Sequence, residues 1–376
     1  MCEPLQGDVP TMDRRQIVRT GAVGAVAATL SRPALAQSPL PEVKWRLTSS
    51  FPKSLDTLFG ATEFLARRVA QMTDNRFQIR TFAAGEIVPP LQALDAVQNG
   101  TVECAQTAPY YYIGKDATFA FGTAVPFGLN TRQHTAWLRH GGGQELMDEL
   151  YKSYNTTAFQ MGHTGAQMGG WFRKEIKSLD DLKGLKMRIA GFAGQVMQKL
   201  GVLPQQLAAG EVYSALEKGT IDAMEFVGPH DDQKLGIAKV APFYHYPAWW
   251  EGGAALSLFV NLQAFEALPE SYRAILQAAC TEATEWTLAK YDALNPRALR
   301  ELVAGGTKLV PFPAAVLEAS FAAAKEVFAE TSAANPRFKK VHDSYMAFRA
   351  EEVLWFRVAE NGFDTFMARQ SAANRL

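Results

Sequence analysis

Arg188 and Glu225 are the two residues whose types and positions most clearly suggest chemistry. Arg188 ends a short apolar run in SLDDLKGLKMRIAG, and Glu225 ends another in EVYSALEKGTIDAMEFVGP. Such runs are typical of buried strands, and the ends of neighbouring parallel strands meet at one edge of a sheet. A guanidinium there can hold a carboxylate through two parallel hydrogen bonds. The pair predicts a cleft that grips a small anion; the alternative is an ion pair between Arg188 and an acidic residue of the same chain.

Two carboxylates, Glu225 and Glu251, lie in apolar company. Glu225 belongs to DAMEF and Glu251 to WWEGG. A carboxylate in such surroundings must be neutralised by a cation or by a proton. Because no cysteine or histidine stands directly beside them, the ligands of a cation would be oxygens, which suit Na⁺ or Ca²⁺. Gln167, in GAQMGG, could add an amide oxygen. The alternative is that each glutamate is half-exposed or paired with a lysine.

Two aromatic clusters could form walls of a small pocket. Tyr110, Tyr111 and Tyr112 follow a predicted strand, and Trp249 and Trp250 form the second cluster. Tyrosine hydroxyls at the end of a strand can hydrogen-bond a ligand, although aromatic clusters more commonly belong to a core. Both uses stay open at this stage.

Motifs of enzymes are weak in this chain. The six histidines have no metal-ligand spacing, and there is no P-loop, G-x-G-x-x-G or G-x-S-x-G. The S-x-x-K match from Ser50 to Lys53 lacks its companion motifs. We therefore expect a binding protein without catalytic residues. The alternative is a metal-assisted enzyme acting on a small carbonyl acid, with Glu225 or Glu251 as the base.

The composition is that of a globular protein with room for about two domains. The 376 residues are 48% hydrophobic, and 38 basic residues balance 38 acidic ones. A chain without net charge lacks the basic surface that nucleic acids attract, so no nucleic-acid partner is expected. Cys104 and Cys280 form no disulfide framework. We expect both to be buried fillers, with a single disulfide between them as the alternative.

Residues 1–36 have the pattern of an export signal. Arg14-Arg15 precedes a short apolar stretch, residues 21–30, and the letters ALA stand directly before Gln37. The paired arginines are similar to a twin-arginine signal. We predict cleavage before Gln37 and a mature protein that is soluble in the periplasm.

The pattern of apolar residues predicts an α/β fold. From Lys44 onward strands and helices alternate, as in a parallel sheet covered by helices. The predicted strands are 44–49, 77–82, 102–107, 168–172, 185–189, 223–226 and a long return segment, 252–261; the predicted helices are 54–71, 89–98, 192–200, 211–218, 270–294, 297–305, 314–334 and 339–369. The last helix has an apolar stripe, which belongs either to the core or to the contact with a second subunit.

Taken together, these segments resemble the solute-binding proteins of TRAP (tripartite ATP-independent periplasmic) transporters, of the DctP type. The resemblance covers residues 43–376 and is carried by LTSSFPKSLDT, DLKGLKMRIAG and EVYSALEKGTIDAMEFVGP. Four further segments are most similar to the branch that binds 2-oxo acids together with a metal ion: VECAQTAPYYYIGKD, TGAQMGGWFR, VLPQQLAAGEVY and YHYPAWWEGG.

The resemblance implies a set of substrate-binding residues. Arg188 stands at the position of the family's carboxylate-binding arginine. Gln167 stands where the sialic-acid branch has a second arginine, whose charge a metal ion would replace. Tyr111, Tyr112 and Phe51 are the other residues that the resemblance implies for the substrate pocket.

The resemblance also implies a set of metal ligands. These are the side chains of Gln167, Glu225 and Glu251 and the backbone carbonyl of Phe226, which is usually a tryptophan in this branch. A backbone ligand is retained whichever side chain the residue carries. The expected ion is Na⁺, with Ca²⁺ as the alternative.

The family further implies a two-lobed periplasmic binding protein fold with a long C-terminal helical tail. We expect lobe I to comprise residues 43–164 and 253–294, lobe II residues 165–252 and 295–336, and the tail residues 337–376. The lobes are expected to close over a small 2-oxo acid such as pyruvate and to deliver it to the TRAP membrane permease subunits. This branch also implies a homodimer that exchanges its C-terminal helices.

Overall fold

The structure is a computed structural model, and it describes residues 40–375. The predicted export signal, residues 1–36, lies outside the described residues. None of the helices in the described part of the chain is both long enough and apolar enough to cross a membrane.

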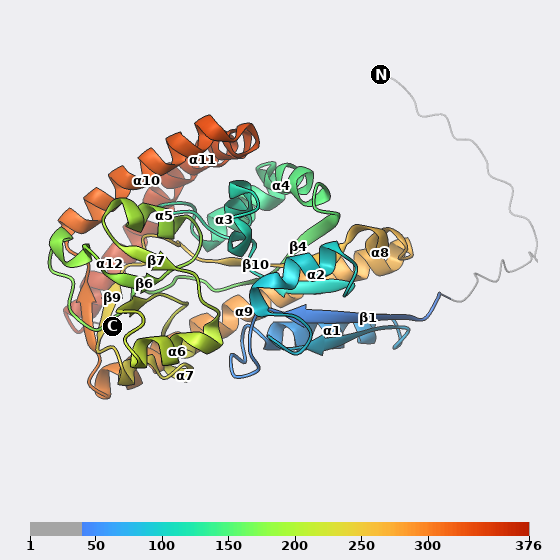
Figure 1. Cartoon of the computed structure of the whole chain (residues 1–376), viewed down its shortest axis with the longest axis horizontal. Helices are drawn as coiled ribbons and strands as arrows, with labels where there is room; N and C mark the ends of the chain where they lie inside the picture. Colours follow the sequence, from blue (N-terminus) through green and yellow to red (C-terminus); the bar gives the residue numbers. More distant parts are fainter. Residues whose placement is uncertain (1–39, 376) are drawn as a thin grey trace, which may run out of the picture. The chain divides into compact units, whose positions relative to one another are not determined.

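Two separate sheets organise the described chain (Figure 1). The first has the order β2-β1-β3-β10-β4 and the second the order β11-β9-β5-β8-β6-β7. The strands of the first are β1 (Val43–Ser49), β2 (Phe77–Phe82), β3 (Cys104–Thr107), β4 (Thr156–His163) and β10 (Ala255–Asn261). Those of the second are β5 (Gly170–Phe172), β6 (Lys186–Arg188), β7 (Leu203–Gln205), β8 (Ala223–Met224), β9 (Phe243–Tyr246) and β11 (Lys308–Pro311).

We call the part of the chain built on the first sheet lobe I and the part built on the second sheet lobe II. The predicted α/β class with two lobes is confirmed, while the residue boundaries of the lobes stay a prediction. Strand β1 pairs in parallel with both β2 and β3, as the predicted strand–helix alternation requires. The return segment β10 is also confirmed, and it lies antiparallel between β3 and β4.

Helices cover both sheets. Lobe I carries α1 (Gly60–Met72), α2 (Ala93–Gln98), α3 (Thr131–His140) and α4 (Gly143–Lys152), and lobe II carries α5 (Gly191–Lys199), α6 (Ala209–Glu217) and α7 (Pro229–Lys234). The remaining helices are α8 (Leu262–Glu266), α9 (Glu270–Ala304), α10 (Ala314–Ala334), α11 (Pro336–Phe356) and α12 (Gly362–Ala372). The sequence analysis did not predict α3, α4, α7, α8, β4, β7, β9 or β11.

The helix predicted from residue 54 begins later than expected. Residues 53–59 form turns, and α1 starts at Gly60. Leu55 and Leu58 are nevertheless buried, because they pack in a cluster that includes residues of lobe II. The apolar spacing therefore predicted correctly that these leucines are buried. They are buried in a turn segment that packs against lobe II, not in a helix.

Two helices predicted on either side of Pro296 are one helix, α9. A proline removes one backbone hydrogen bond and normally breaks or kinks a helix. Here α9 continues because its neighbours hold both halves: it packs against β4 and α1 of lobe I and against α7 of lobe II. Helix α9, orange in Figure 1, therefore contacts both lobes.

The predicted C-terminal helix is present and starts slightly earlier than expected. It begins at Pro336, where the Asn335 side chain accepts a hydrogen bond from the Phe338 N–H, and a π-helical turn at residues 357–361 joins α11 to α12. The first part of α11 is anchored in lobe I, where the Tyr345 hydroxyl accepts a 2.7 Å hydrogen bond from the Leu129 N–H. Cys104 and Cys280 are both buried and free, as predicted for fillers.

Candidate anion and metal site

Arg188 and Glu225 meet at the edge of the second sheet. Strands β6 and β8 are parallel neighbours, with Arg188 opposite Met224, so the two residues emerge side by side. The Arg188 Nη1 atom lies 2.5 Å from Glu225 Oε1 and also donates to the Glu225 backbone carbonyl. Both side chains are 1% exposed. The intramolecular ion pair that the sequence left as an alternative is therefore present.

The backbone around this pair is fitted closely to it. The Ala190 N–H donates a 3.0 Å hydrogen bond to Glu225 Oε1, and Arg188 Nε donates to the Leu207 carbonyl at 3.2 Å. Gly191 has a φ of +63°, and a Cβ atom there would collide with the ring of Tyr110. Glycine at this turn therefore lets an aromatic ring of lobe I lie directly against the arginine loop of lobe II.

The second glutamate completes an acidic pair. Glu251 is 3% exposed, and the Tyr110 hydroxyl and the Gln167 amide lie near enough to its carboxyl to lower its pKa. Gln167 also donates from Nε2 to Thr164 Oγ1 at 3.0 Å. The sequence analysis named Tyr110 only as a member of its cluster and missed Thr164, because hydroxyls are too common in sequence to mark a site.

Burial and charge act in opposite directions on the three ionisable groups. Burial raises the pKa of Glu225, and the Arg188 charge opposes that rise only in part. The pKa of Glu251 is raised well above its usual value by burial and then by the charge of Glu225. Burial would lower the pKa of Arg188, but the nearby acidic groups raise it further, so the guanidinium stays charged.

Three buried oxygen atoms have the chemistry of cation ligands. Gln167 Oε1, Glu225 Oε2 and Glu251 Oε2 have no hydrogen-bond partner among residues 40–375. Buried polar atoms are nearly always satisfied in native proteins, and two carboxylate oxygens with one amide oxygen form a ligand set for a hard cation. These are the side chains predicted as metal ligands, and the donor set fits the ion.

Aromatic and aliphatic side chains from both lobes enclose a small cavity beside these groups. Its volume is about 10 Å³, and its lining includes Phe51, Leu58, Tyr110, Tyr111, Gln167 and Phe226. The Arg188 guanidinium lies over the Phe226 ring, 5.4 Å from its centre. Burial raises the pKa of Tyr111 to about 12, and the nearby Arg188 charge opposes that rise.

Tyr112 is not brought to this cavity. Its hydroxyl bonds the Leu94 N–H at 3.1 Å and Thr107 Oγ1 at 3.0 Å, inside the core of lobe I. Residues 109–112 form a 3-10 turn, in which successive side chains point in directions about 120° apart. Trp249 and Trp250 are likewise buried in the core.

Two further buried acids lie on α7, next to the site. Asp232 accepts hydrogen bonds from Trp171 Nε1 at 2.9 Å and from the Tyr244 hydroxyl at 2.6 Å. Asp231 accepts one from the Tyr291 hydroxyl at 2.5 Å. Burial raises their pKa values, to about 7 for Asp231 and about 6 for Asp232. The motif HDDQK gave no sign of this, since such a charged segment is usually exposed.

Comparison with known proteins identifies relatives over nearly the whole described chain. Residues 48–335 match the model of the DctP family, the bacterial extracellular solute-binding proteins of family 7. The chain is 51% identical over 360 residues to a monocarboxylate 2-oxoacid-binding periplasmic protein of Nostoc sp. (strain PCC 7120), a match that covers 94% of this chain and 99% of the relative.

Solved structures agree with this match. A TRAP transporter solute-binding protein from Bordetella bronchiseptica RB50, a mixed-occupancy dimer with copurified calcium and picolinate, is 50% identical with a TM-score of 0.88; the match covers 89% of this chain and 99% of that one. Another from Pseudoalteromonas atlantica T6c, with bound sodium and pyruvate, is 37% identical with a TM-score of 0.84; that match covers 86% and 98%.

The buried Asp231 should make the stability of the protein depend on pH. Its folded pKa of about 7 lies above the usual value for aspartate, so folding favours its protonated form. This contribution is fully present below the unfolded pKa of about 4 and is lost as the pH rises toward 7. Asp231→Asn cannot lose it, and its free energy of unfolding in urea should fall less over this window, by roughly a few kcal/mol.

Tyr291→Phe is the companion variant. It removes the hydroxyl that stabilises the Asp231 carboxylate, so the pKa of Asp231 should rise further and the loss of stability should become larger. Identical pH profiles for Asp231→Asn and the unaltered protein would show that Asp231 does not titrate in this range.

Proposed function

The chain belongs to the DctP family of bacterial extracellular solute-binding proteins, and we propose that it is a TRAP receptor for a small 2-oxo monocarboxylate bound together with a metal cation. The predicted receptor, rather than the metal-assisted enzyme, agrees with the family. Proteins of this family act in the periplasm with a membrane permease, and we extend both the location and the permease partner to this chain.

The proposal is carried by the three buried oxygen atoms that have no partner in the described residues. One guanidinium and two carboxylates give the site a net charge of −1 when all three are ionised. A monocarboxylate would bring this to −2 in a dry environment, where uncompensated charge is costly. A cation held by Gln167, Glu225 and Glu251, with the Phe226 carbonyl, removes this obstacle, and it would bind an acid through Lewis-acid attraction.

The same charge count bears on which ion binds. With a monocarboxylate present, Ca²⁺ makes the site neutral, whereas Na⁺ leaves one negative charge. The charge balance therefore favours Ca²⁺, and Na⁺, the ion expected from the sequence, is the alternative. The relatives are divided: the structure from B. bronchiseptica contains calcium and that from P. atlantica contains sodium.

The remaining groups suit a short acid. Arg188 uses Nε and Nη1 for the Leu207 and Glu225 oxygens, which leaves Nη2 to hold a ligand carboxylate beside the Tyr111 hydroxyl. Phe51 and Leu58 offer an apolar wall to a short alkyl group. The cavity of about 10 Å³ has room for about one water molecule and its lining comes from both lobes, so a ligand needs the lobes to separate before it can enter. Closure then removes the charges from water and strengthens their attraction.

We also propose that the C-terminal tail forms a homodimer. Six large apolar side chains on the tail are 53–73% exposed: Val353, Leu354, Trp355, Val358, Phe363 and Phe366. An apolar cavity of about 420 Å³, lined in part by Phe127, Phe321 and Met346, lies beside the same helix. A patch and a groove of this kind on one surface suit an exchange of tails between two copies of the chain.

The role of Arg188 can be tested without leaving the two glutamates unpaired. Arg188→Ala would remove the only positive charge of the ion pair with Glu225 and destabilise the fold by about 3–5 kcal/mol. Arg188→Lys keeps a charge but loses the planar fork, so pyruvate affinity measured by calorimetry should fall about 100-fold. The exposed Arg173→Lys is the matched control and should bind normally. An Arg188→Lys affinity within about threefold of the unaltered protein would contradict the assignment.

The cation can be tested by removal. Protein treated with a strong chelator and desalted should lose pyruvate binding, and titration with Ca²⁺ or Na⁺ should restore it for the ion that the site prefers. Glu251→Gln should lower the affinity for the restoring ion at least about tenfold, whereas Glu217→Gln, an exposed change on α6, should not.

Because protons compete for Glu251, whose pKa is raised, the ion should bind more weakly as the pH falls. Full pyruvate affinity in metal-free protein would rule out the cation.

The dimer can be tested by charge. The double variant Trp355→Glu/Val358→Glu places two charges in the exposed tail patch and should convert a dimer into a monomer in sedimentation equilibrium. Gln277→Glu, an exposed change on α9 away from the tail, should leave the mass unchanged. A monomeric unaltered protein at all concentrations would refute the proposal.

A further inference from the structure

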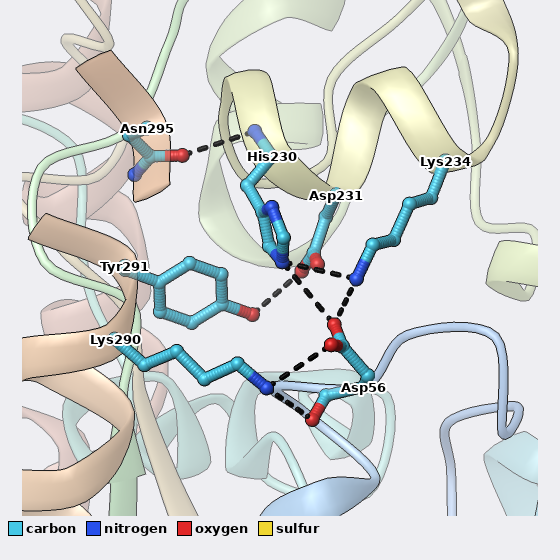
Figure 2. Close-up of polar contacts among 7 residues, drawn as sticks. All are labelled: Asp56, His230, Asp231, Lys234, Lys290, Tyr291 and Asn295. Carbon is cyan, nitrogen blue, oxygen red and sulfur yellow. Dashed lines mark hydrogen bonds and ion pairs between the residues drawn. The ribbon is translucent and has the colours of Figure 1, made fainter. Parts of the chain in front are cut away.

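Asp56 lies in the turn of lobe I that follows β1 and faces α7 of lobe II (Figure 2). Its carboxylate contacts Lys234 Nζ and lies 3.2 Å from His230 Nε2, both on α7. From the other side, Lys290 on α9 donates to the Asp56 carbonyl at 2.9 Å and to Asp56 Oδ2 at 3.1 Å. One carboxylate is therefore shared by cations from two different parts of the fold.

These contacts join parts of the chain that no other described ion pair joins. Within residues 40–375, the ion pair of Asp56 with Lys234 is the one that links residues 43–164 to residues 165–252; the His230 ring beside the same carboxylate would count as a cation only when protonated. Every other ion pair of the described chain lies within one of these segments or involves the chain after residue 261. Asp56 is therefore a single electrostatic connection between the strand-bearing parts of the two lobes.

The cluster also has the ligand types of a metal site, but its charges argue against one. Oxygen or nitrogen atoms of Asp56, His230 and Asp231 lie within 4.8 Å of one another. However, Lys234 Nζ contacts the Asp56 carboxylate and lies 3.0 Å from His230 Nε2, so its ammonium already occupies the position between them. Two lysines supply the positive charge that an ion would bring. Figure 2 shows both ammonium groups directed at the Asp56 carboxylate.

We propose that Asp56, Lys234 and Lys290 form an interlobe latch that stabilises the closed arrangement of this receptor. The Lys290 ammonium lies over the Trp286 ring, 4.8 Å from its centre, and Trp286 stacks on Phe64 of α1, so Lys290 holds the Asp56 carboxylate from the lobe I side of α9. Lys234 belongs to α7 of lobe II, so its contact with Asp56 forms when the lobes come together. The latch rests on the proposed function only in that closure is taken to accompany ligand binding.

The exposure of the pair sets how strong the latch is. The Asp56 side chain is 52% exposed and that of Lys234 is 28% exposed, in contrast to the fully buried pair of Arg188 and Glu225. Water and salt screen such a contact, so it contributes modestly and can be broken easily. This suits a receptor that must open again, because a strong interlobe pair would hold the lobes closed without a ligand.

Helix α7 is held in a position where this contact can form. The His230 N–H donates to Asn295 Oδ1 at 3.0 Å, and Asp231 accepts from the Tyr291 hydroxyl, so α7 is fastened to α9 by polar contacts at two successive residues. Pro296 directly follows Asn295, and a proline weakens the helix at that point. The latch thus lies beside the segment of α9 where the two lobes meet.

The first test is ligand affinity. Asp56→Asn keeps the shape of the side chain and removes its charge; the Kd for pyruvate, measured with saturating Ca²⁺, should rise about two- to fivefold at low salt. The difference should shrink at about 1 M salt. Lys234→Met should have the same effect, and the double variant should be no weaker than either single one. Asp95→Asn, which removes a 2.6 Å ion pair with Lys115 inside lobe I, is the control and should bind normally.

The second test does not depend on the ligand. Spin labels at Glu63→Cys on α1 and Lys218→Cys directly after α6 report the distance between the lobes. The labelled chain begins at Gln37, so it lacks Cys2 of the predicted export signal, and its native Cys104 and Cys280 are buried away from the label. In ligand-free protein, Asp56→Asn should shift the distances toward longer values, and Asp95→Asn should not. Distances and affinities for Asp56→Asn that match those of Asp95→Asn would overturn the latch. If no pyruvate binds to the unaltered protein, the proposed function fails, and the distances still decide the latch.

Discussion

The structure depends on holding one positive and two negative side chains in a space that excludes water. Arg188 and Glu225 are 1% exposed and Glu251 is 3% exposed, so their charges are hardly screened by solvent. In such surroundings an unbalanced charge costs several kcal/mol, of the order that a whole domain gains on folding. A site with more negative than positive groups is therefore costly for the empty protein and favourable for a cation that completes it. The same imbalance makes the fold sensitive to what it binds.

The fold brings these charged groups together from separate parts of the chain. Parallel pairing of β6 and β8 places Arg188 beside Glu225, and the chain after β9 delivers Glu251. Lobe I supplies Phe51 and the tyrosines, so neither lobe makes the cavity alone. Because the walls come from both lobes, the ligand that we propose would hold the lobes together when it bridges these charges.

The structure contains two ion pairs that differ in burial and in their relation to the lobes. The pair of Arg188 and Glu225 lies within lobe II and is fully buried, so it fixes the position of the arginine side chain. The contact of Asp56 with Lys234 crosses between the lobes and is partly exposed, so it adds a small and reversible bias. The buried pair fixes a side chain in place, whereas the exposed pair contributes only a small bias, because water and salt screen the exposed pair and hardly reach the buried one.

The sequence by itself determined the α/β fold class, the strands that end beside Arg188 and Glu225, the burial of the two cysteines and the apolar surroundings of Glu225 and Glu251. Periodicity and charges within apolar runs are local signals, so one segment suffices to show them. Only the tertiary structure decided that Arg188 pairs with Glu225, that Tyr110 rather than Tyr112 reaches the acidic pair, and that α9 continues through Pro296. It also placed Asp56 between two lysines that follow it far along the chain. These outcomes depend on which side chains meet across the two lobes, and packing between distant segments leaves no pattern in any one of them.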